Sequence, residues 1–250
     1  MDSLKIVDLT RKFNDNVALN HINLEFESKK TYALVGHNGA GKTTLIKHIL
    51  GLYAITECEQ GNILYDNKEI SLRDRQKSIS NSTELYALFE DLTVIEYINF
   101  AVNVYRRKKD KEYLRKMEDK IDELLKMFEI DHMKNKFIYA LSNGMKRKVA
   151  HIVAFIKWDG FCFLDEPFSA LDPVAIYNMK QYIKNHYKEQ SYIISTHQLS
   201  ILDSFDFPNE DLIYIFMSQG NVIFQGTKQQ LLEVREVNNI EQAYLSFSRD

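Results

Sequence analysis

The chain has 250 residues, 45% of them hydrophobic, and a formal net charge of −3 at pH 7. This length suits one large domain or a core with a subdomain, and the charge excludes the overall basic field of a nucleic-acid-binding protein. Its two cysteines, Cys58 and Cys162, are too few for a disulfide framework or a cysteine metal site. The first residues lack the apolar core of a signal peptide, and no apolar run reaches the roughly 18 residues that span a bilayer. We therefore expect a cytoplasmic protein that reaches a membrane only through a partner.

Short apolar segments in the first quarter of the chain predict strands. Residues 4–9 and 22–26 have the pattern of half-exposed strands, and the second alternates strictly, with apolar side chains at 22, 24 and 26. Residues 31–35 form a short apolar run that is typical of a buried parallel strand. Residues 62–65, followed by Asp-Asn, indicate a hairpin strand and its turn.

Residues 36–43 match in full the phosphate-binding loop pattern G-x-x-x-x-G-K-[ST]. The glycines let backbone N–H groups turn toward a polyphosphate, which side chains with a Cβ would obstruct. We expect Lys42 to reach the β- and γ-phosphates and the Thr43 hydroxyl to ligate Mg²⁺. Helical spacing over 44–50 follows, so a helix N-terminus points at the anion. The candidate nucleotide-binding residues of this segment are Gly36, His37 (by position alone, with no chemistry assigned), Asn38, Gly39, Ala40, Gly41, Lys42, Thr43 and Thr44.

The middle of the chain, from about Thr93 to Phe137, is predicted to be helical. Its apolar residues at i, i+3, i+4 and i+7 form a stripe, made of Ile121, Leu124, Leu125 and Phe128. The basic run 106–111 is interpreted as a solvated helix or loop, and contact with lipid headgroups or an acidic partner is the alternative.

Two adjacent carboxylates end the next predicted strand. Residues 161–164 are apolar, and Asp165 and Glu166 follow them. Because parallel strands direct their C-terminal ends at the ligand crevice, Asp165 can hold Mg²⁺ and Glu166 can accept a proton from an attacking water. The alternative is an ordinary strand followed by an acidic turn before Pro167.

The last part of the chain continues the alternation of strands and helices. Residues 191–195 predict a further parallel strand, 212–217 and 221–224 an antiparallel hairpin, and the tail from Thr227 a helix. Apolar strands that alternate with helical stretches indicate an α/β fold.

Several short motifs resemble those of ABC-type ATPases. Leu141–Arg147, which reads LSNGMKR, resembles the LSGGQ signature motif and comes shortly before the strand that ends in the two carboxylates. Ser169–Asp172 resembles the D-loop of that family, Ser195–His197 its switch-histidine strand end, and Asp91–Val94 with Glu96 the stretch after its Q-loop. The motifs occur in the order that the family keeps, and the resemblance covers nearly the whole chain.

The resemblance implies a fold and a domain organisation. We expect a P-loop NTPase core with a mostly parallel sheet, an N-terminal antiparallel β subdomain and an inserted α-helical subdomain at about 85–155. A helical tail is expected at 225–250, and residues 1–250 together form a single ABC ATPase domain.

It also implies roles for matching positions. Phe13 would stack on adenine, since a flat apolar face suits a base; a loop or core aromatic is the alternative. Ser142 and Gly144 would contact the γ-phosphate of an ATP held by the opposite subunit, although Ser142 also suits a plain helix cap. His197 would bond the γ-phosphate and orient the water. Asp172 would lie at the dimer interface and help to shape both sites. The histidines without motif context, interpreted as structural, are His21, His48, His132, His151 and His186.

Three positions depart from the family pattern. Asn143 stands where LSGGQ has a glycine, and Asn tolerates left-handed backbone angles. Met145 replaces the usual Gln. Glu84 occupies the Q-loop glutamine position, where a carboxylate could ligate Mg²⁺ or water; glutamate here resembles ATPases paired with antibiotic-resistance and lantibiotic-immunity exporters. The apolar segment 85–89 is expected to receive a permease helix, at least in part, or else to belong to the helical core.

These expectations combine into one function. The chain would be the ATP-hydrolysing subunit of an ABC transporter, with export as the direction, ATP and Mg²⁺ as ligands, and no nucleic acid. Its partners would be a second copy of itself and an integral membrane permease, which would hold it at the inner face of the cell membrane. The alternatives are a soluble ABC ATPase of a non-transport assembly, a non-hydrolysing nucleotide-binding regulator, and a phosphotransferase. Lys42, Asp165, Glu166 and His197 argue against the regulator, and the signature motif against the phosphotransferase.

Overall fold

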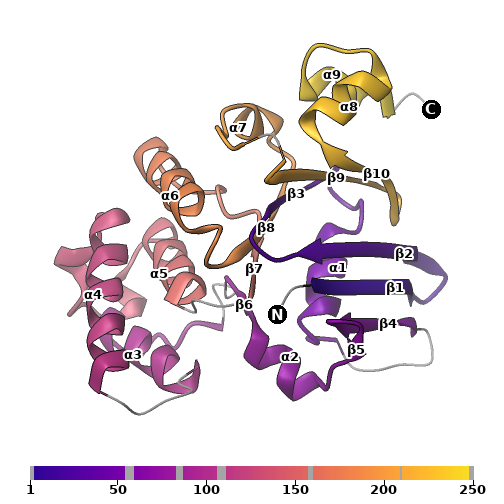
Figure 1. Ribbon diagram of the computed structural model, residues 1–250. Coiled ribbons are helices and arrows are strands. Elements are labelled where there is room, and N and C mark those ends of the chain that lie inside the picture. The colour runs from indigo at the N-terminus through magenta and orange to yellow at the C-terminus, as the bar shows by residue number, and fades with distance from the viewer. Residues whose placement is uncertain are drawn as a thin grey trace.

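The computed structural model describes residues 3–53, 59–82, 87–105, 111–156, 160–208 and 210–247. In this part of the chain, two sheets lie beside one another, with helices gathered mainly on one side and at the carboxyl end (Figure 1). Glu84, Cys58 and residues 106–110 of the basic run, all named above, lie outside the described residues. Of the helices in the described ranges, none combines the length and the apolarity that a membrane crossing requires.

The first sheet is antiparallel, as expected for the N-terminal part of the chain. Its strands, in the spatial order β2-β1-β4-β5, are β1 (Ser3–Phe13), β2 (Asn16–Glu27), β4 (Glu59–Tyr65) and β5 (Lys68–Glu69). The alternation in β2 is confirmed, because Ile22, Leu24 and Phe26 are all buried. β1 continues four residues beyond the predicted end, with register shifts along its length, and it thereby carries Phe13 to the far end of the sheet.

The second sheet is mostly parallel. Its spatial order is β10-β9-β3-β8-β7-β6, made of β3 (Thr31–Val35), β6 (Ile79–Asn81), β7 (Phe161–Asp165), β8 (Ser191–Thr196), β9 (Leu212–Ser218) and β10 (Asn221–Thr227). Only the β9–β10 pair, the predicted hairpin, is antiparallel. β6, which was not predicted, adds a parallel strand at the edge beside β7.

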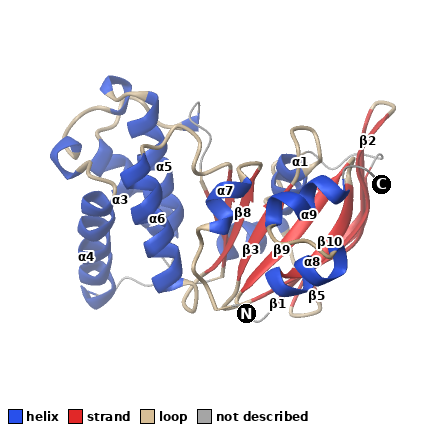
Figure 2. Ribbon diagram, turned by 90° about the horizontal axis from the view of Figure 1, so that it is seen from above, coloured by secondary structure: helices blue, strands red, loops and turns tan. Residues whose placement is uncertain are grey.

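The helices are α1 (Lys42–Ile49), α2 (Leu72–Ser78), α3 (Val94–Tyr105), α4 (Lys111–Met127), α5 (Asn143–Ile156), α6 (Pro173–His186), α7 (Leu199–Asp203), α8 (Lys228–Arg235) and α9 (Ile240–Phe247). Short 3₁₀ turns, η2 (Asp131–Met133) and η3 (Ile138–Ala140), lie between α4 and α5. α3, α4, α5 and α6 gather on one side of the sheets, and α8 and α9 lie beside β10 (Figure 2). The helical region is thus divided into separate helices rather than one long helix.

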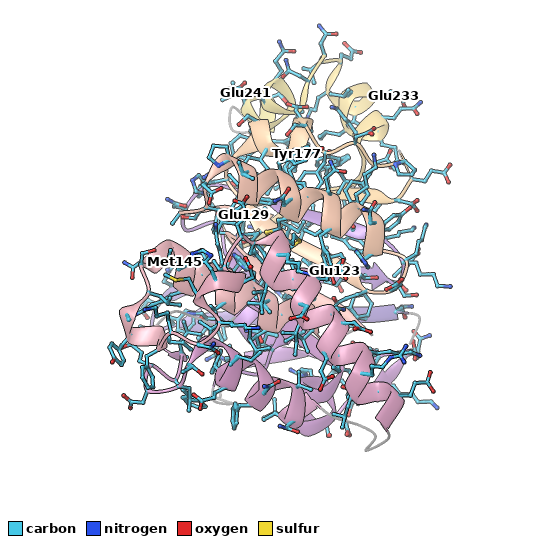
Figure 3. All side chains as sticks on the ribbon, turned by 90° about the vertical axis from the view of Figure 1, so that its left-hand side faces the viewer. Glu123, Glu129, Met145, Tyr177, Glu233 and Glu241 are labelled. Carbon is cyan, nitrogen blue, oxygen red and sulfur yellow. The ribbon has the colours of Figure 1, made fainter. Side chains whose placement is uncertain are left out.

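Hydrophobic burial joins these parts. The stripe predicted on α4 and just after it is buried, while Glu123 on the opposite face is exposed, as the side view shows (Figure 3). The two sheets meet through side chains such as Phe26 of β2 and Phe163 of β7, whose rings pack edge to face at 5.8 Å. Leu45 and Ile46 of α1 belong to the same buried cluster. The phosphate loop and α1 are therefore anchored between two sheets, which is how a rigid core positions a site.

Candidate active site

The predicted phosphate loop connects β3 to α1. Residue Gly41 is the N-cap of α1 and has a φ of 106°, a left-handed conformation that favours glycine. A Cβ added there would lie 2.8 Å from the carbonyl oxygen of Ala18 in β2. The loop is closed at its tip by a hydrogen bond of 3.1 Å from the Ala40 N–H to the His37 carbonyl. The first turn of a helix leaves N–H groups without a partner inside the helix, so the start of α1 at this loop can bind an anion.

The ammonium of Lys42 lies at the centre of the loop. Its Nζ donates to the carbonyls of Gly36 at 2.6 Å and His37 at 3.2 Å, and it lies 3.7 Å from Glu166 Oε1. The side chain is almost completely buried. Burial lowers the pKa of Lys42, and the nearby carboxylates of Glu166 and Asp165 oppose that lowering. Lys42 thus supplies a positive charge with little solvent around it, where Coulomb interactions are strong.

The carboxylate of Asp165 is held from two sides. Thr43 Oγ1 donates to Asp165 Oδ2 at 2.7 Å, and Ser195 Oγ donates to Oδ1 at 2.5 Å. Ser195 is the direct neighbour of Asp165 in the parallel pairing of β7 and β8. The Thr43 hydroxyl and the Asp165 carboxylate are oxygen donors on adjoining elements, and oxygens are the ligands that Mg²⁺ prefers. These residues therefore fit the magnesium ion that the sequence predicts.

Glu166 and His197 are brought together at the ends of neighbouring strands. His197 Nδ1 lies 2.9 Å from Glu166 Oε1; because an ionised carboxylate only accepts, Nδ1 carries the hydrogen. The Glu166 N–H donates to Ser195 Oγ at 2.9 Å. The main chain of Glu166 is left-handed, with a φ of 45°. A carboxylate that can act as a base and a histidine therefore form one contact beside Lys42.

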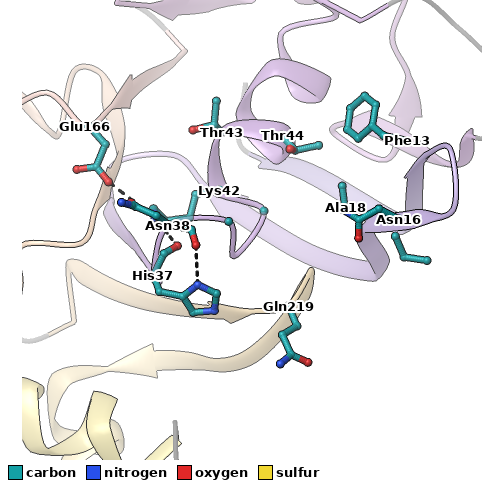
Figure 4. A pocket seen from close by; sticks show the side chains of 13 residues that line it. Phe13, Asn16, Ala18, His37, Asn38, Lys42, Thr43, Thr44, Glu166 and Gln219 are labelled. Carbon is teal, nitrogen blue, oxygen red and sulfur yellow. Dashed lines mark hydrogen bonds and ion pairs between the residues drawn. The ribbon is translucent and has the colours of Figure 1, made fainter.

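A pocket of about 710 Å³ runs along the loop (Figure 4). Phe13 lies at one end of it and Glu166 at the other, with the loop and the start of α1 between them. The predicted residues that line it are Phe13, His37, Asn38, Gly39, Gly41, Lys42, Thr43, Thr44 and Glu166. The lining residues that sequence reasoning missed are Asn16, Val17, Ala18 and Gln219. Gln219 comes from the β9–β10 turn, and only the folded chain brings that turn to the loop.

Phe13 and His37 occupy different surroundings within this pocket. The ring of Phe13 is 39% exposed and is braced by the guanidinium of Arg11, 5.2 Å from its centroid, and by the ring of Tyr53 at 5.5 Å. It is thus a supported ring with a free part, rather than a core aromatic. His37 Nδ1 donates to the neighbouring Asn38 carbonyl at 2.8 Å, which fits a residue without a chemical role.

Ser142, Gly144 and Asp172 lie apart from the described lining of this pocket. The Ser142 hydroxyl accepts from the Met145 N–H at 3.3 Å and so caps α5, whose outer end Met145 marks in Figure 3. Asp172 caps α6, accepting from the Ala175 N–H at 2.8 Å. An ion pair with Lys148, 2.8 Å away, is the main cause that lowers the pKa of Asp172.

Comparisons with known proteins agree with this geometry. A family model described as ABC transporter matches residues 19–169. The ABC-type transporter ATP-binding protein EcsA of Bacillus subtilis is 30% identical, over 93% of this chain and 90% of its own length. The sulfate/thiosulfate import ATP-binding protein CysA of Mannheimia succiniciproducens is 29% identical over 88% of this chain, which spans only 60% of that relative.

Solved structures give the same result. A structure described as the ATP binding subunit of an ABC transporter has a TM-score of 0.84 at 25% identity, and covers 98% of this chain and 99% of its own. CbiO1 from Clostridium perfringens, described as part of the ABC transporter complex CbiONQ, has a TM-score of 0.71 at 27% identity, covering 94% and 93%. With the family matched over more than half of its length, the chain belongs to the ABC transporter ATP-binding family and is an ATPase that binds ATP.

Proposed function

We propose that this chain drives a separate membrane permease by hydrolysing ATP, and that it does so as an ATP-dependent homodimer at the cytoplasmic face of the membrane. The observation that carries the hydrolytic part is the 2.9 Å contact between His197 and Glu166, beside a Lys42 ammonium 3.7 Å from the same carboxylate oxygen. A carboxylate there can take the proton of an attacking water, which supports hydrolysis over passive nucleotide binding. The signature motif at Leu141–Arg147 is what argues against phosphotransfer.

In the proposed reaction, each side chain has a defined role. Lys42 offsets the negative charge of the β- and γ-phosphates. Glu166 takes a proton from a water molecule while the water oxygen attacks the γ-phosphorus. The bond from that phosphorus to the β–γ bridging oxygen then breaks and leaves ADP. His197 holds Glu166 through Nδ1, so Nε2 donates to the γ-phosphate only when the ring is protonated. Mg²⁺ held by Thr43 and Asp165 would supply positive charge to the phosphate oxygens.

The shape of the pocket supports ATP as the occupant. Adenine would stack on the exposed part of Phe13, and the triphosphate would follow the loop to Glu166. Asn16 and Gln219 line the same space from β2 and from the β9–β10 turn.

The proposed dimer rests on the residues that lie apart from this pocket. Ser142 and Gly144 stand at the N-terminus of α5, which offers N–H groups and a hydroxyl to an anion. Neither residue lines the pocket of its own chain, and we infer that they would contact the nucleotide of a second copy, as the resemblance to ABC-type ATPases implies. Asp172 caps the next helix at this face and would take part in the same interface. Such a pairing is isologous and closed.

The proposed permease contact lies near the end of the predicted segment 85–89, of which residues 87–89 are described. Leu88 is buried, as the core alternative requires, whereas Phe89 is 50% exposed. The Phe89 ring packs on Tyr97 at 5.8 Å and on the half-exposed Phe100 at 5.2 Å, both on α3. Tyr97 is buried, so the rings of Phe89 and Phe100 form the half-exposed part of this cluster, which supports contact with an apolar helix. The descriptions of EcsA and CbiO1 both name a transporter, which agrees with a membrane permease as the partner.

Export as the direction depends on Glu84 alone, which lies outside the described residues. The relatives named for sulfate or thiosulfate import favour the opposite direction. Transport of the substrate in inverted membrane vesicles that contain the permease and this chain decides between export and import. Because the cytoplasmic face of such vesicles points outward, ATP-driven uptake of the substrate into them supports export.

Glu166→Gln tests the hydrolytic proposal. The variant should bind ATP with nearly wild-type affinity, release phosphate about 10²-fold more slowly or worse, and accumulate as a dimer with ATP. Calorimetry, a phosphate-release assay and size-exclusion chromatography measure these three properties, with Lys42→Ala as the control that loses binding. Near-normal turnover in Glu166→Gln would refute Glu166 as the base.

Co-sedimentation tests the transport proposal. The chain should pellet with membranes only when the permease is present. An active ATPase that stays in the supernatant beside its permease would favour the soluble, non-transport alternative.

A further inference from the structure

Two side chains on one face of α5 donate to successive carbonyls of the main chain after β7. Arg147 Nη1 donates to the carbonyl of Glu166 at 3.2 Å, and His151 Nε2 lies 3.0 Å from the carbonyl of Pro167. Arg147 and His151 are four residues apart, so they stand on the same face of the helix. α5 therefore contacts the backbone at the residue proposed as the base and at the residue that follows it.

The hydrogen bonds of His151 have a fixed direction. A carbonyl only accepts, so Nε2 carries the hydrogen, and Nδ1 then accepts from the hydroxyl of Ser82, 3.1 Å away. The ring is fully buried and stacks on Phe128 with centroids 6.1 Å apart. Burial, with the positive charge of Arg147, lowers the pKa of His151 to about 3, so the ring stays neutral at physiological pH. Both nitrogens are thus used, one as donor and one as acceptor.

Glu166 needs such support, because its φ of 45° lies in a region that residues other than glycine seldom adopt. Its main-chain groups are all engaged. The N–H donates to Ser195 Oγ, and the carbonyl accepts from Arg147 and from the Ser169 N–H at 3.2 Å. A strained conformation of this kind persists only where its neighbours determine it.

We propose that His151 and Arg147 are positioning residues for ATP hydrolysis: from α5 they fix the carbonyls of Glu166 and Pro167 and thereby aim the Glu166 carboxylate. The bond from His151 to Ser82 extends this support to the end of β6. The inference rests on the proposed role of Glu166 as base. A residue that merely stabilised the fold would also need its hydrogen bonds satisfied, so the test must separate turnover from stability.

His151→Leu and His151→Gln separate the two roles. Leu removes both hydrogen bonds, whereas the Gln amide offers one donor and one acceptor at a spacing like that of the imidazole nitrogens. We expect His151→Leu to lower kcat tenfold or more with the Kd for ATP within twofold, and His151→Gln to recover at least half of the wild-type kcat. Phe155→Leu is the matched control, because Phe155 is buried on the same helix and stacks on the same Phe128. This variant should lower the melting temperature and leave kcat per folded molecule within twofold of wild type.

Three results would overturn the proposal: a kcat for folded His151→Leu within twofold of wild type, a parallel loss of ATP affinity, or a His151→Gln variant as slow as His151→Leu. If His151→Leu does not fold, Arg147→Met carries the test, because it should lower kcat at unchanged Kd by removing the donor to the Glu166 carbonyl. Glu166→Gln, assayed alongside, checks the proposed base separately. If Glu166→Gln hydrolyses ATP normally while His151→Leu is slow, the role of Glu166 as base is contradicted. If Glu166→Gln is slow while His151→Leu is normal, only the positioning role of His151 is contradicted.

Discussion

Burial of His151 makes the stability of the fold depend on pH. The side chain is fully buried, and burial is the main cause that lowers its pKa from 6.5 to about 3; Arg147 adds to the lowering, while the bond to the Pro167 carbonyl opposes it. In the unfolded chain the ring has its ordinary pKa and takes up a proton first as the pH falls. The unfolded state therefore binds more protons than the folded state between about pH 6.5 and about pH 3, and folding stability falls as the pH falls through that window.

The size of this effect follows from linkage. One extra proton on the unfolded state costs about 1.36 kcal/mol of stability per pH unit. From about pH 7.5 to about pH 5, only the last ~1.5 units lie below the unfolded pKa, so His151 accounts for a loss of about 2 kcal/mol. Burial, together with Arg11 and Arg75, lowers the pKa of His48 to about 4, so this histidine adds a similar loss.

Urea unfolding of wild type and His151→Gln, followed by circular dichroism at several pH values, measures the contribution of His151 alone, because His48 is common to both proteins. The free energy of unfolding of wild type should fall by about 2 kcal/mol more than that of His151→Gln between about pH 7.5 and about pH 5. His48→Gln should flatten the wild-type curve by a similar amount. A difference between wild type and His151→Gln that stays constant over this range would refute the assignment of His151 as a buried neutral histidine.

Other predictions concern the nucleotide site. Phe13→Ala removes the stacking face and should weaken ATP binding by about 1–3 kcal/mol in calorimetry, with GTP affected alike because every base has such a face. Gly41→Ala should abolish ATP binding, because the added Cβ would lie 2.8 Å from a carbonyl oxygen of β2. A Cβ added at Gly39 has no atom within 4 Å, so Gly39→Ala should bind ATP more nearly like wild type, although the φ of Gly39 is also positive. Ser195→Ala leaves the Glu166 N–H without its acceptor and should lower kcat in phosphate-release assays by about tenfold, equivalent to about 1.4 kcal/mol, with less effect on Kd.

The phosphate loop could be predicted because its sequence pattern restricts the backbone directly. A glycine at 41 is required by the close approach of β2, and Lys42 one residue later falls at the start of α1. The position of Asp165 and Glu166 could be predicted because the apolar run of a buried strand shows where the strand ends. The carboxyl ends of parallel strands lie at one edge of the sheet, where a ligand binds.

What could not be predicted depends on contacts between distant segments. β6 has only three residues, too few for a hydrophobic period, and it forms because β7 pairs with it. Gln219 reaches the pocket through the β9–β10 turn. From the sequence, His151 is interpreted as structural because no motif surrounds it. Its partners Ser82 and Pro167 lie 69 and 16 residues away, so no local pattern connects them.

Ser142 illustrates how two interpretations of one residue can both hold. Helix capping and contact with a γ-phosphate were treated as alternatives, yet the cap uses the hydroxyl oxygen only as an acceptor from the Met145 N–H. A hydroxyl has one donor and two acceptor positions, so the Ser142 O–H can still donate to a phosphate oxygen of a second copy. The cap fixes the oxygen at the start of α5, and the same helix holds the Glu166 carbonyl through Arg147. In the proposed dimer, α5 would therefore connect the phosphate of the second copy to the main chain of Glu166, the proposed base.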